Sequence, residues 1–116
     1  MTQQINTDNI RDISQILKLL GDKTRLITMK LLEHQECCVC ELVEIINTSQ
    51  PAISQHLRKL KDVGLVKEER RGQWIFYSIN RENKHYELIE KLIGYVPSQN
   101  HEFETLAKKG LRVTCK

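Results

Sequence analysis

The chain has 116 residues, a length that suits one domain with a modest core and leaves no room for a second. Its formal net charge of +3 favours a polyanionic partner, but many solvated surfaces carry such an excess. Whether the partner is a polyanion therefore depends on where the charges lie along the chain. No apolar run is long enough to cross a membrane, and the first residues lack the order of a signal peptide. We therefore expect a cytoplasmic protein with no membrane partner, whose four cysteines stay reduced.

Apolar residues at helical spacing predict two helices at the start of the chain. The first covers residues 10–20 and ends at Gly21. The second covers about 22–34, where the Asp22 carboxylate can accept hydrogen bonds from the unpaired amides of the first turn. Both helices have one apolar side, so both are expected to pack on a core.

Two further helices follow at the spacing of a helix-turn-helix. Residues 36–46 form a short amphipathic helix that a turn ends. Ser49 then caps a helix that runs to Gly64, and Pro51 lies in its first turn, where a missing amide costs nothing. Together these helices predict a helix-turn-helix over about residues 36–63.

The remaining chain predicts a wing and a helical C-terminal part. Residues 65–80 hold two short β-prone runs around Gly72, which is typical of a hairpin. Helical spacing returns in a C-terminal helix and tail over 83–116, with a last candidate helix at about 103–108. The apolar stripes of the first and C-terminal helices exceed what so small a core needs, although a monomeric core could also use them. We expect one mainly α (α+β) domain over 1–116, a winged helix-turn-helix with terminal dimerisation helices.

Polar and basic residues gather on the second helix of the helix-turn-helix and on the hairpin. The N-terminal half of such a helix enters the major groove, where Gln pairs with adenine and Ser with several base edges. A lone amphipathic helix would show the same polar face, but the preceding helix, the turn and the basic hairpin favour duplex DNA as the partner. Trp74 and Tyr77 are interpreted as packing residues of the hairpin. The predicted DNA contacts are Ser49, Gln50, Ser54, Gln55, His56, Arg58, Lys59, Arg70 and Arg71.

Three cysteines, Cys37, Cys38 and Cys40, lie within four positions at the expected start of the third helix. The positive end of a helix favours thiolates, and soft thiolates select thiophilic ions. Trivalent arsenic and antimony take three sulfurs in a pyramid, so three close cysteines suit them. Free cysteines are usually buried as small hydrophobes, but three so close together favour a ligand site.

Four segments of the chain resemble the ArsR/SmtB family of metal-responsive repressors, and most closely its arsenite-responsive branch. The resemblance spans roughly residues 10–80 and rests on Gly21–Leu26, Glu36–Leu42, Ser49–Leu57 and Gly64–Val66. It implies a transcriptional repressor, not an enzyme, that binds double-stranded operator DNA as a homodimer. It also implies that the repressor leaves the operator when an inducer binds, here arsenite or antimonite.

The resemblance assigns the paired ligand positions to Cys38 and Cys40, but it leaves the third ligand open. Val43 stands where the branch usually has a third cysteine, and Cys37 stands where it usually has an apolar residue. The third sulfur is therefore Cys37 or Cys115. We favour Cys37, because it is already beside the pair, whereas Cys115 must order a terminal segment.

The expected helix has a mechanistic consequence. Residues i and i+2 lie about 200° apart around a regular helix, so Cys38 and Cys40 can share an ion only if the turn unwinds. Ligand binding is then expected to distort the third helix and displace the recognition helices.

Other uses of these cysteines give two alternative functions and one alternative ligand. A thiol redox or persulfide sensor would oxidise the same residues on the same fold. A thiol oxidoreductase could use the C-x-x-C spacing of Cys37 and Cys40, but it would require a βαβ setting. A zinc site with His34 would need further Cys or His residues nearby.

Overall fold

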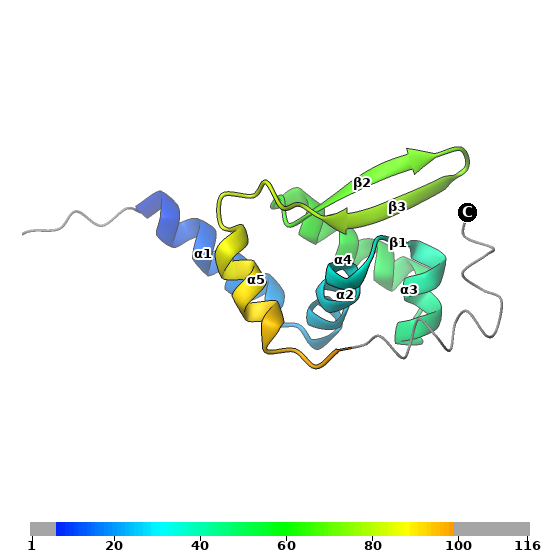
Figure 1. The fold of residues 1–116 in the computed structure, drawn as a ribbon, viewed down its shortest axis with the longest axis horizontal. Helices are drawn as coiled ribbons and strands as arrows, with labels where there is room; N and C mark the ends of the chain where they lie inside the picture. The colour runs from blue at the N-terminus through cyan, green and yellow to red at the C-terminus, as the bar shows by residue number, and fades with distance from the viewer. Residues whose placement is uncertain (1–6, 99–116) are drawn as a thin grey trace, which may run out of the picture.

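Helices and a small sheet alternate along the chain (Figure 1). The computed structural model describes the backbone of residues 7–98 and the side chains of residues 9–98. The helix expected at 103–108 and Cys115 lie outside the described residues. In chain order the elements are α1 (Thr7–Leu20), α2 (Lys23–His34), β1 (Cys37–Cys38), α3 (Val39–Ile46), α4 (Gln50–Asp62), β2 (Val66–Arg71), β3 (Trp74–Ile79) and α5 (Tyr86–Gly94).

Local capping explains where α2, α3 and α4 begin or end. The Asp22 carboxylate accepts a hydrogen bond from the Arg25 amide at 3.0 Å and caps α2. The Ser49 hydroxyl accepts from the Ala52 amide at 3.3 Å and caps α4. Asn47 ends α3 in the left-handed region, with φ of 60°. The predicted winged helix-turn-helix fold, mainly α (α+β), is confirmed.

The sheet joins the hairpin to the segment that precedes α3. Its strand order is β1-β3-β2, with both pairs antiparallel. The hairpin turns at Gly72, whose φ of 61° suits a residue without a side chain. β1 pairs with β3 so that Cys37 lies opposite Tyr77 and Cys38 opposite Phe76. The cysteine segment is therefore hydrogen-bonded directly to the wing.

The prediction that a helix begins at residue 36 is wrong. Cys37 and Cys38 form the strand β1, and α3 begins only at Val39. Cys38 is the N-cap of α3, and the Glu41 carboxylate accepts from the Cys38 amide at 3.0 Å. A capping box of this kind fixes a helix start at its first member. The backbone groups before Cys38 pair with β3 instead of continuing the helix.

The core lies where α2 and α4 meet the other elements. Apolar side chains from every helix and from the sheet are buried together in it, among them Leu20, Met29, Leu42, Leu57, Ile79 and Ile89. The buried Thr28 hydroxyl is satisfied, since it donates to the Thr24 carbonyl at 2.8 Å. Two apolar side chains of α1, Ile10 and Leu17, are 53% and 50% exposed. None of the helices between residues 7 and 98 is long and apolar enough to span a membrane.

Candidate functional site

The outer face of α4 carries the polar residues that the sequence predicts as DNA contacts. α4 turns Ile53, Leu57 and Leu60 into the core and packs against α3. The remaining face is exposed and holds Gln50, Ser54, Gln55, Arg58 and Lys59. Ser49 is also exposed, although its hydroxyl caps the helix. Most of the predicted set is thus presented on one helix face.

His56 is the member of the set that faces inward. The Arg25 guanidinium lies 3.1 Å from His56 Nδ1 and also donates to the Leu19 carbonyl at 2.7 Å. Burial lowers the pKa of His56; Asp22 raises it, whereas Arg25 and Lys59 lower it. Since a guanidinium only donates, Nδ1 of the neutral ring accepts and Nε2 carries the proton. His56 therefore braces α4 against α2 instead of offering Nδ1 to a base.

A groove separates α4 from the wing, and an ion pair bridges it. The groove holds about 280 Å³, and Lys61 reaches across it to Glu68 of β2 at 2.5 Å. Lys61 and then Tyr77 lower the pKa of Glu68 through hydrogen bonds. Burial, together with the Glu68 contact, raises the pKa of Tyr77 to about 12, so its hydroxyl stays a donor. These contacts orient the wing relative to α4.

The two arginines of the wing tip have different surroundings. Arg70 is exposed. The Arg71 guanidinium donates to the two Glu36 oxygens at 2.6 and 2.8 Å, donates to Glu69, and stacks 4.7 Å from the Phe76 ring centroid. Glu36 and then Glu69 raise the pKa of Arg71, and Arg71 lowers the pKa of Glu36. Arg71, predicted as a DNA contact, is thus held by carboxylates of its own chain.

Cys38 and Cys40 converge at the joint between β1 and α3. Their Sγ atoms lie 2.7 Å apart. Cys38 is 2% exposed at the N-cap, whereas Cys40 is exposed in the first turn. Because Cys38 precedes the helix, the expectation that a turn must unwind to bring the two sulfurs together is wrong. We call Cys38 and Cys40 the thiol pair.

The thiol pair opens into a pocket that three elements form. The pocket holds about 400 Å³ and lies between α3, the start of α4 and the wing tip. Besides the two cysteines, its lining consists of Val39, Val43, Gln50, Gln73, Trp74 and Ile75. We call this space the thiol pocket. The thiol pair, the start of α4 and the wing tip therefore line one pocket.

Cys37 does not join the pair in this conformation. Residues directly opposite on paired strands point to the same face of a sheet, and neighbours along a strand point to opposite faces. Cys37 lies opposite Tyr77 on the core side of the sheet and is 0% exposed. Its Sγ donates a hydrogen bond to the Gln35 carbonyl oxygen at 3.5 Å. Among the described side chains, no three His, Cys, Asp or Glu groups form a metal site.

Sequence reasoning missed two residues of this region, Glu36 and Trp74. Both depend on the pairing of β1 with β3, which joins segments far apart in the chain. The one local signal was the spacing of Cys38 and Glu41, which matches a capping box with Cys in place of Ser or Thr. Interpreted as a capping box, this spacing predicts that the helix begins after Cys38.

Comparisons with known proteins agree with this fold and motif set. The arsenic resistance transcriptional regulator ArsR1 of Pseudomonas putida is 34% identical over 89 residues, which cover 76% of this chain and 68% of the relative. The arsenical resistance operon repressor of Bacillus subtilis is 34% identical over 90 residues, covering 77% and 86%.

Solved structures agree as well. Reduced HlyU from Vibrio cholerae superposes with a TM-score of 0.68 at 30% identity and covers 78% of this chain and 96% of its own. A homodimeric winged helix-turn-helix domain from Mycobacterium bovis has a TM-score of 0.65 at 22% identity, covers 84% and 94%, and supports the fold alone. The family model described as bacterial regulatory protein, arsR family, matches residues 22–68. With these motifs and relatives, the chain belongs to the ArsR family of bacterial transcriptional regulators.

Proposed function

We propose that this protein is a metalloid-responsive repressor that binds operator DNA as a homodimer and leaves it when arsenite or antimonite binds the thiol pair. The observation that carries the proposal is the 2.7 Å approach of the Cys38 and Cys40 sulfurs beside both α4 and the wing. The arsenic resistance names of the two relatives support the choice of ligand.

DNA binding is assigned to α4 and the wing. Gln50, Ser54 and Gln55 are exposed on the N-terminal half of α4, the half that reads base edges in this class of fold. Arg58 and Lys59 follow on the exposed face, where cations contact phosphates. Arg70 adds an exposed cation on the wing.

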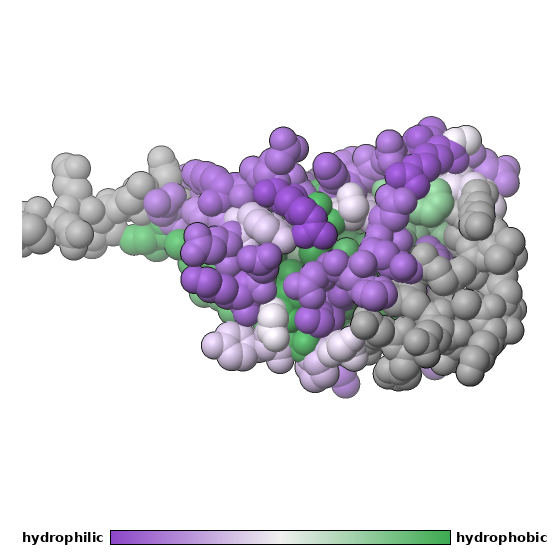
Figure 2. All heavy atoms as spheres, in the orientation of Figure 1, coloured by the Kyte–Doolittle hydropathy of each residue, from purple (hydrophilic) through white to green (hydrophobic). Residues whose placement is uncertain are grey.

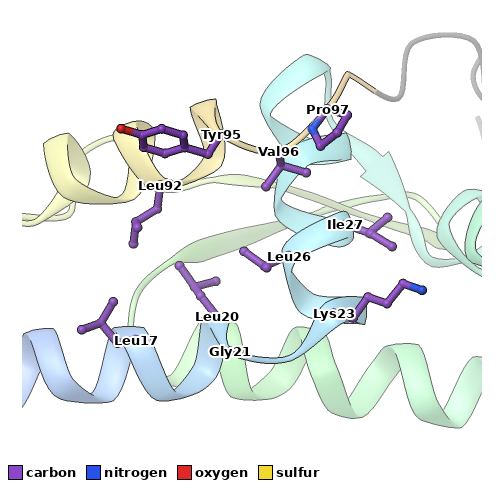
Figure 3. A pocket seen from close by; sticks show the side chains of 10 residues that line it. All are labelled: Leu17, Leu20, Gly21, Lys23, Leu26, Ile27, Leu92, Tyr95, Val96 and Pro97. Atoms are coloured by element: carbon purple, nitrogen blue, oxygen red, sulfur yellow. The ribbon is translucent and has the colours of Figure 1, made fainter.

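Dimerisation is assigned to α1 and α5. Between them, an apolar groove of about 690 Å³ holds side chains from α1, α2 and α5, and Leu17, Leu20 and Leu92 point into it (Figure 3). Tyr95, at the edge of the groove, is 89% exposed. Contact with a second copy would cover this surface. It would also hold two copies of α4 about one DNA turn apart, as two half-sites require.

The inducer is assigned to the thiol pair, with a third sulfur from Cys37 or Cys115. Cys37 is buried on the opposite face of β1, so it can join only if β1 separates from β3. Cys115 would join from the C-terminal tail. Arsenic X-ray absorption on Cys37→Ser and Cys115→Ser decides between them, because the variant that lacks the third ligand should show two sulfurs instead of three.

Release follows from the position of the thiol pair between two DNA-binding elements. Cys38 pairs with Phe76 of β3, and Cys40 belongs to α3, which packs on α4. A metalloid that draws the sulfurs into its own geometry therefore moves β1 against α3, and with them the wing against α4. To empty an almost fully occupied operator, the ligand has to prefer the non-binding state by about 5 kcal/mol.

An operator gel shift with and without arsenite tests the proposal. Wild-type protein should bind and then dissociate as arsenite rises. Cys38→Ser should keep operator affinity within a few-fold and lose the response, because serine does not ligate arsenic. A matched control is Ser78→Ala, a change of similar size on β3 outside the thiol pocket, which should respond like the wild type. A Cys38→Ser protein that dissociates at the wild-type arsenite concentration would contradict the assignment.

A second candidate uses the same sulfurs as a redox sensor. Their proximity favours it, since two thiols can give two electrons and two protons to a peroxide, forming one disulfide and two waters. The same gel shift with hydrogen peroxide in place of arsenite separates the candidates. The redox sensor would be favoured if peroxide releases the operator and arsenite at the same concentrations does not.

A further inference from the structure

We infer that a cleft between α1, α2 and α4 binds the phosphate backbone of DNA on the side of α4 away from the wing. The cleft holds about 400 Å³, and its charged lining consists of Lys18 of α1, Arg25 of α2, and Lys59 and Asp62 of α4. We call it the basic cleft. The inference rests on the proposed function for the choice of DNA as the partner, and it adds a contact surface that includes α1 and α2.

The lysines of the basic cleft are available to an anionic partner. Lys18 and Lys59 are exposed, and neither forms an ion pair with another residue between positions 9 and 98. With Arg25 they place three cations beside one carboxylate. In the groove on the wing side of α4, by contrast, Lys61 is already paired with Glu68. The basic cleft therefore carries the larger uncompensated positive charge of the two.

Arg25 is held in place at the junction of the three helices. Its Nε donates to the Leu19 carbonyl at 2.7 Å, and its Nη1 lies 3.1 Å from Nδ1 of His56. A guanidinium has five N–H donors, and these two contacts use two of them. The other donors are free to meet the oxygens of a phosphate, for which the planar guanidinium is well shaped. Arg25 also joins the last turn of α1 to the middle of α4.

The basic cleft lies on the same side of α4 as the residues assigned to base reading. Lys59 and Asp62 follow Gln55 by four and seven positions, a spacing that puts the three on one helix face. A helix with its side chains is about 10–12 Å across and the major groove is about 12 Å wide, so a helix in the groove lies close to both flanking strands. The wing is assigned to one strand, and the basic cleft then meets the other.

The two faces of α1 determine which phosphates the basic cleft meets. Gln15, Lys18 and Leu19 line the cleft, whereas Leu17 and Leu20 point into the groove assigned to dimerisation (Figure 3). The wing tip lies at the opposite end of the molecule from α1 (Figure 1). In a dimer joined through α1, the cleft is therefore nearer the two-fold axis than α4 is. It meets phosphates on the inner side of each half-site, toward the centre of the operator.

A salt titration of the full chain tests the contact, with the duplex that the wild-type protein selects from a random library as the probe. Lys18→Ala should reduce the slope of log affinity against log salt concentration by about 0.9 for each subunit that loses a contact. Over the decade of salt from 1 M to 0.1 M, that slope corresponds to a loss of about eightfold. Unchanged affinity and slope in Lys18→Ala overturn the inference.

The matched control is Lys91→Ala. This variant removes the same charge from an exposed lysine of α5 that pairs with Glu87, away from the basic cleft. It should bind the selected duplex with the affinity and slope of the wild type. Because Lys18 and Lys91 are both exposed on helices, alanine at either position should leave the fold intact.

Asp62→Asn tests the sign of the charge effect. It removes the carboxylate from the basic cleft and keeps the size of the side chain, so it should strengthen binding to the selected duplex. Weaker binding by Asp62→Asn overturns the inference, because a phosphate in the cleft would be repelled by Asp62.

Methylphosphonate substitution locates the phosphate. Replacing one phosphate of the selected duplex by an uncharged methylphosphonate should weaken the wild type by about eightfold at the position that the cleft meets. Lys18→Ala should respond to the same replacement by less than about twofold, because its contact is already lost. The inference is overturned if no phosphate shows this difference, or if those that show it lie only on the outer sides of the half-sites.

The same complexes separate this inference from the function on which it rests. If the complex depends on Lys18 but survives arsenite, the proposed release is wrong and the basic cleft stands. If arsenite releases a complex that does not depend on Lys18, the basic cleft is wrong and the proposed function stands. A wild-type protein that binds no duplex overturns both.

Discussion

The two ends of the molecule are built from different interactions. At the wing end, ion pairs join separate elements: Arg71 to Glu36, and Lys61 to Glu68. At the other end, apolar side chains line the groove between α1 and α5, and the charged contacts there are those of Asp12 in α1 with Lys84 and His85, just before α5. Figure 2 shows hydrophilic residues over the hairpin, and hydrophobic ones at the start of α1 and in the hollow beside α5. The wing end therefore combines charged groups with thiols, whereas the α1–α5 end offers mainly apolar area beside the contacts of Asp12.

This difference suits the proposed functions of the two ends, which are ligand sensing at the wing end and dimerisation at the α1–α5 end. Apolar association is non-directional and insensitive to small ligands, so it can hold a dimer together in every state of the switch. Ion pairs and thiols have fixed geometry and respond to ligands, acid and salt. A switch placed at the wing end can thus change DNA binding while the dimer persists.

The largest expected effect comes from placing a charge on the apolar end. Leu17→Glu should convert the proposed dimer to monomers, because burying an unpaired carboxylate costs at least about 3 kcal/mol, a factor of roughly 100 in association. Sedimentation equilibrium measures the association. Leu17→Met, which conserves apolar volume, is the matched control and should stay dimeric. A Leu17→Glu protein that remains dimeric would move the interface away from α1.

The next effect belongs to the reading face of α4. Gln55→Ala should lower affinity for the cognate operator by about 1–3 kcal/mol and leave random DNA nearly unaffected, because a base contact is lost and the phosphate contacts remain. Fluorescence anisotropy on the two DNAs measures both affinities. Lys59→Ala, on the same face, should weaken the two DNAs alike. Equal losses on both for Gln55→Ala would show that Gln55 does not read a base.

The parts of the fold that could be predicted from sequence are those fixed by neighbours in the chain. Asp22 and Ser49 cap helices within three residues, and Gly72 turns the hairpin between adjacent strands. The cysteine segment differs, because Cys37 and Cys38 become a strand only through hydrogen bonds to β3. No local pattern reveals a partner that distant, and a two-residue strand is too short for alternation to show.

Dependence on distant segments also explains which features of the candidate site could not be predicted from the sequence. The pairing of Cys38 with Cys40 followed from a motif, since both residues lie in one short segment. The burial of Cys37, the inward turn of His56 and the ion pair of Arg71 each depend on a different element. The residue types were evident there, but the exposure and the partner of each side chain could not be predicted.

A smaller effect is expected at α2, which connects the two ends. Asp22→Ala removes the cap of α2 and should lower the free energy of unfolding by about 1 kcal/mol. Hydrogen bonding to the Arg25 amide lowers the pKa of Asp22. The stabilisation is therefore complete above the unfolded pKa, near 4, and is lost as pH falls through the lower folded pKa. Urea unfolding from pH 7 to pH 2 measures it.

The matched control for the cap is Asp22→Asn. Asparagine caps a helix about as well as aspartate but does not titrate. This variant should keep most of the stability at pH 7 and lack the acid-dependent part. If Asp22→Asn loses as much stability at pH 7 as Asp22→Ala, the contribution comes from the charge and not from the cap.

The smallest effect distinguishes the two arginines of the wing. Each phosphate that a cation neutralises adds about 0.9 to the slope of log affinity against log salt concentration. Arg70→Ala should reduce that slope by about this amount for each subunit that loses a contact. Arg71→Ala should change it less, because Glu36 and Glu69 already offset the charge of Arg71. Operator titrations at several salt concentrations give both slopes.

Glu36 provides a control for the comparison of Arg70 with Arg71, because it pairs with Arg71. Glu36→Gln removes one carboxylate from Arg71 and frees the guanidinium for DNA, so it should steepen the salt dependence in the wild-type background. In the Arg71→Ala background the same change should have little effect on the slope, since no guanidinium is left to release. If Arg71→Ala flattens the slope as much as Arg70→Ala does, the ion pair with Glu36 opens on DNA. Arg71 is then a DNA contact, as its place in the sequence predicts, and the wing end changes its contacts when it binds.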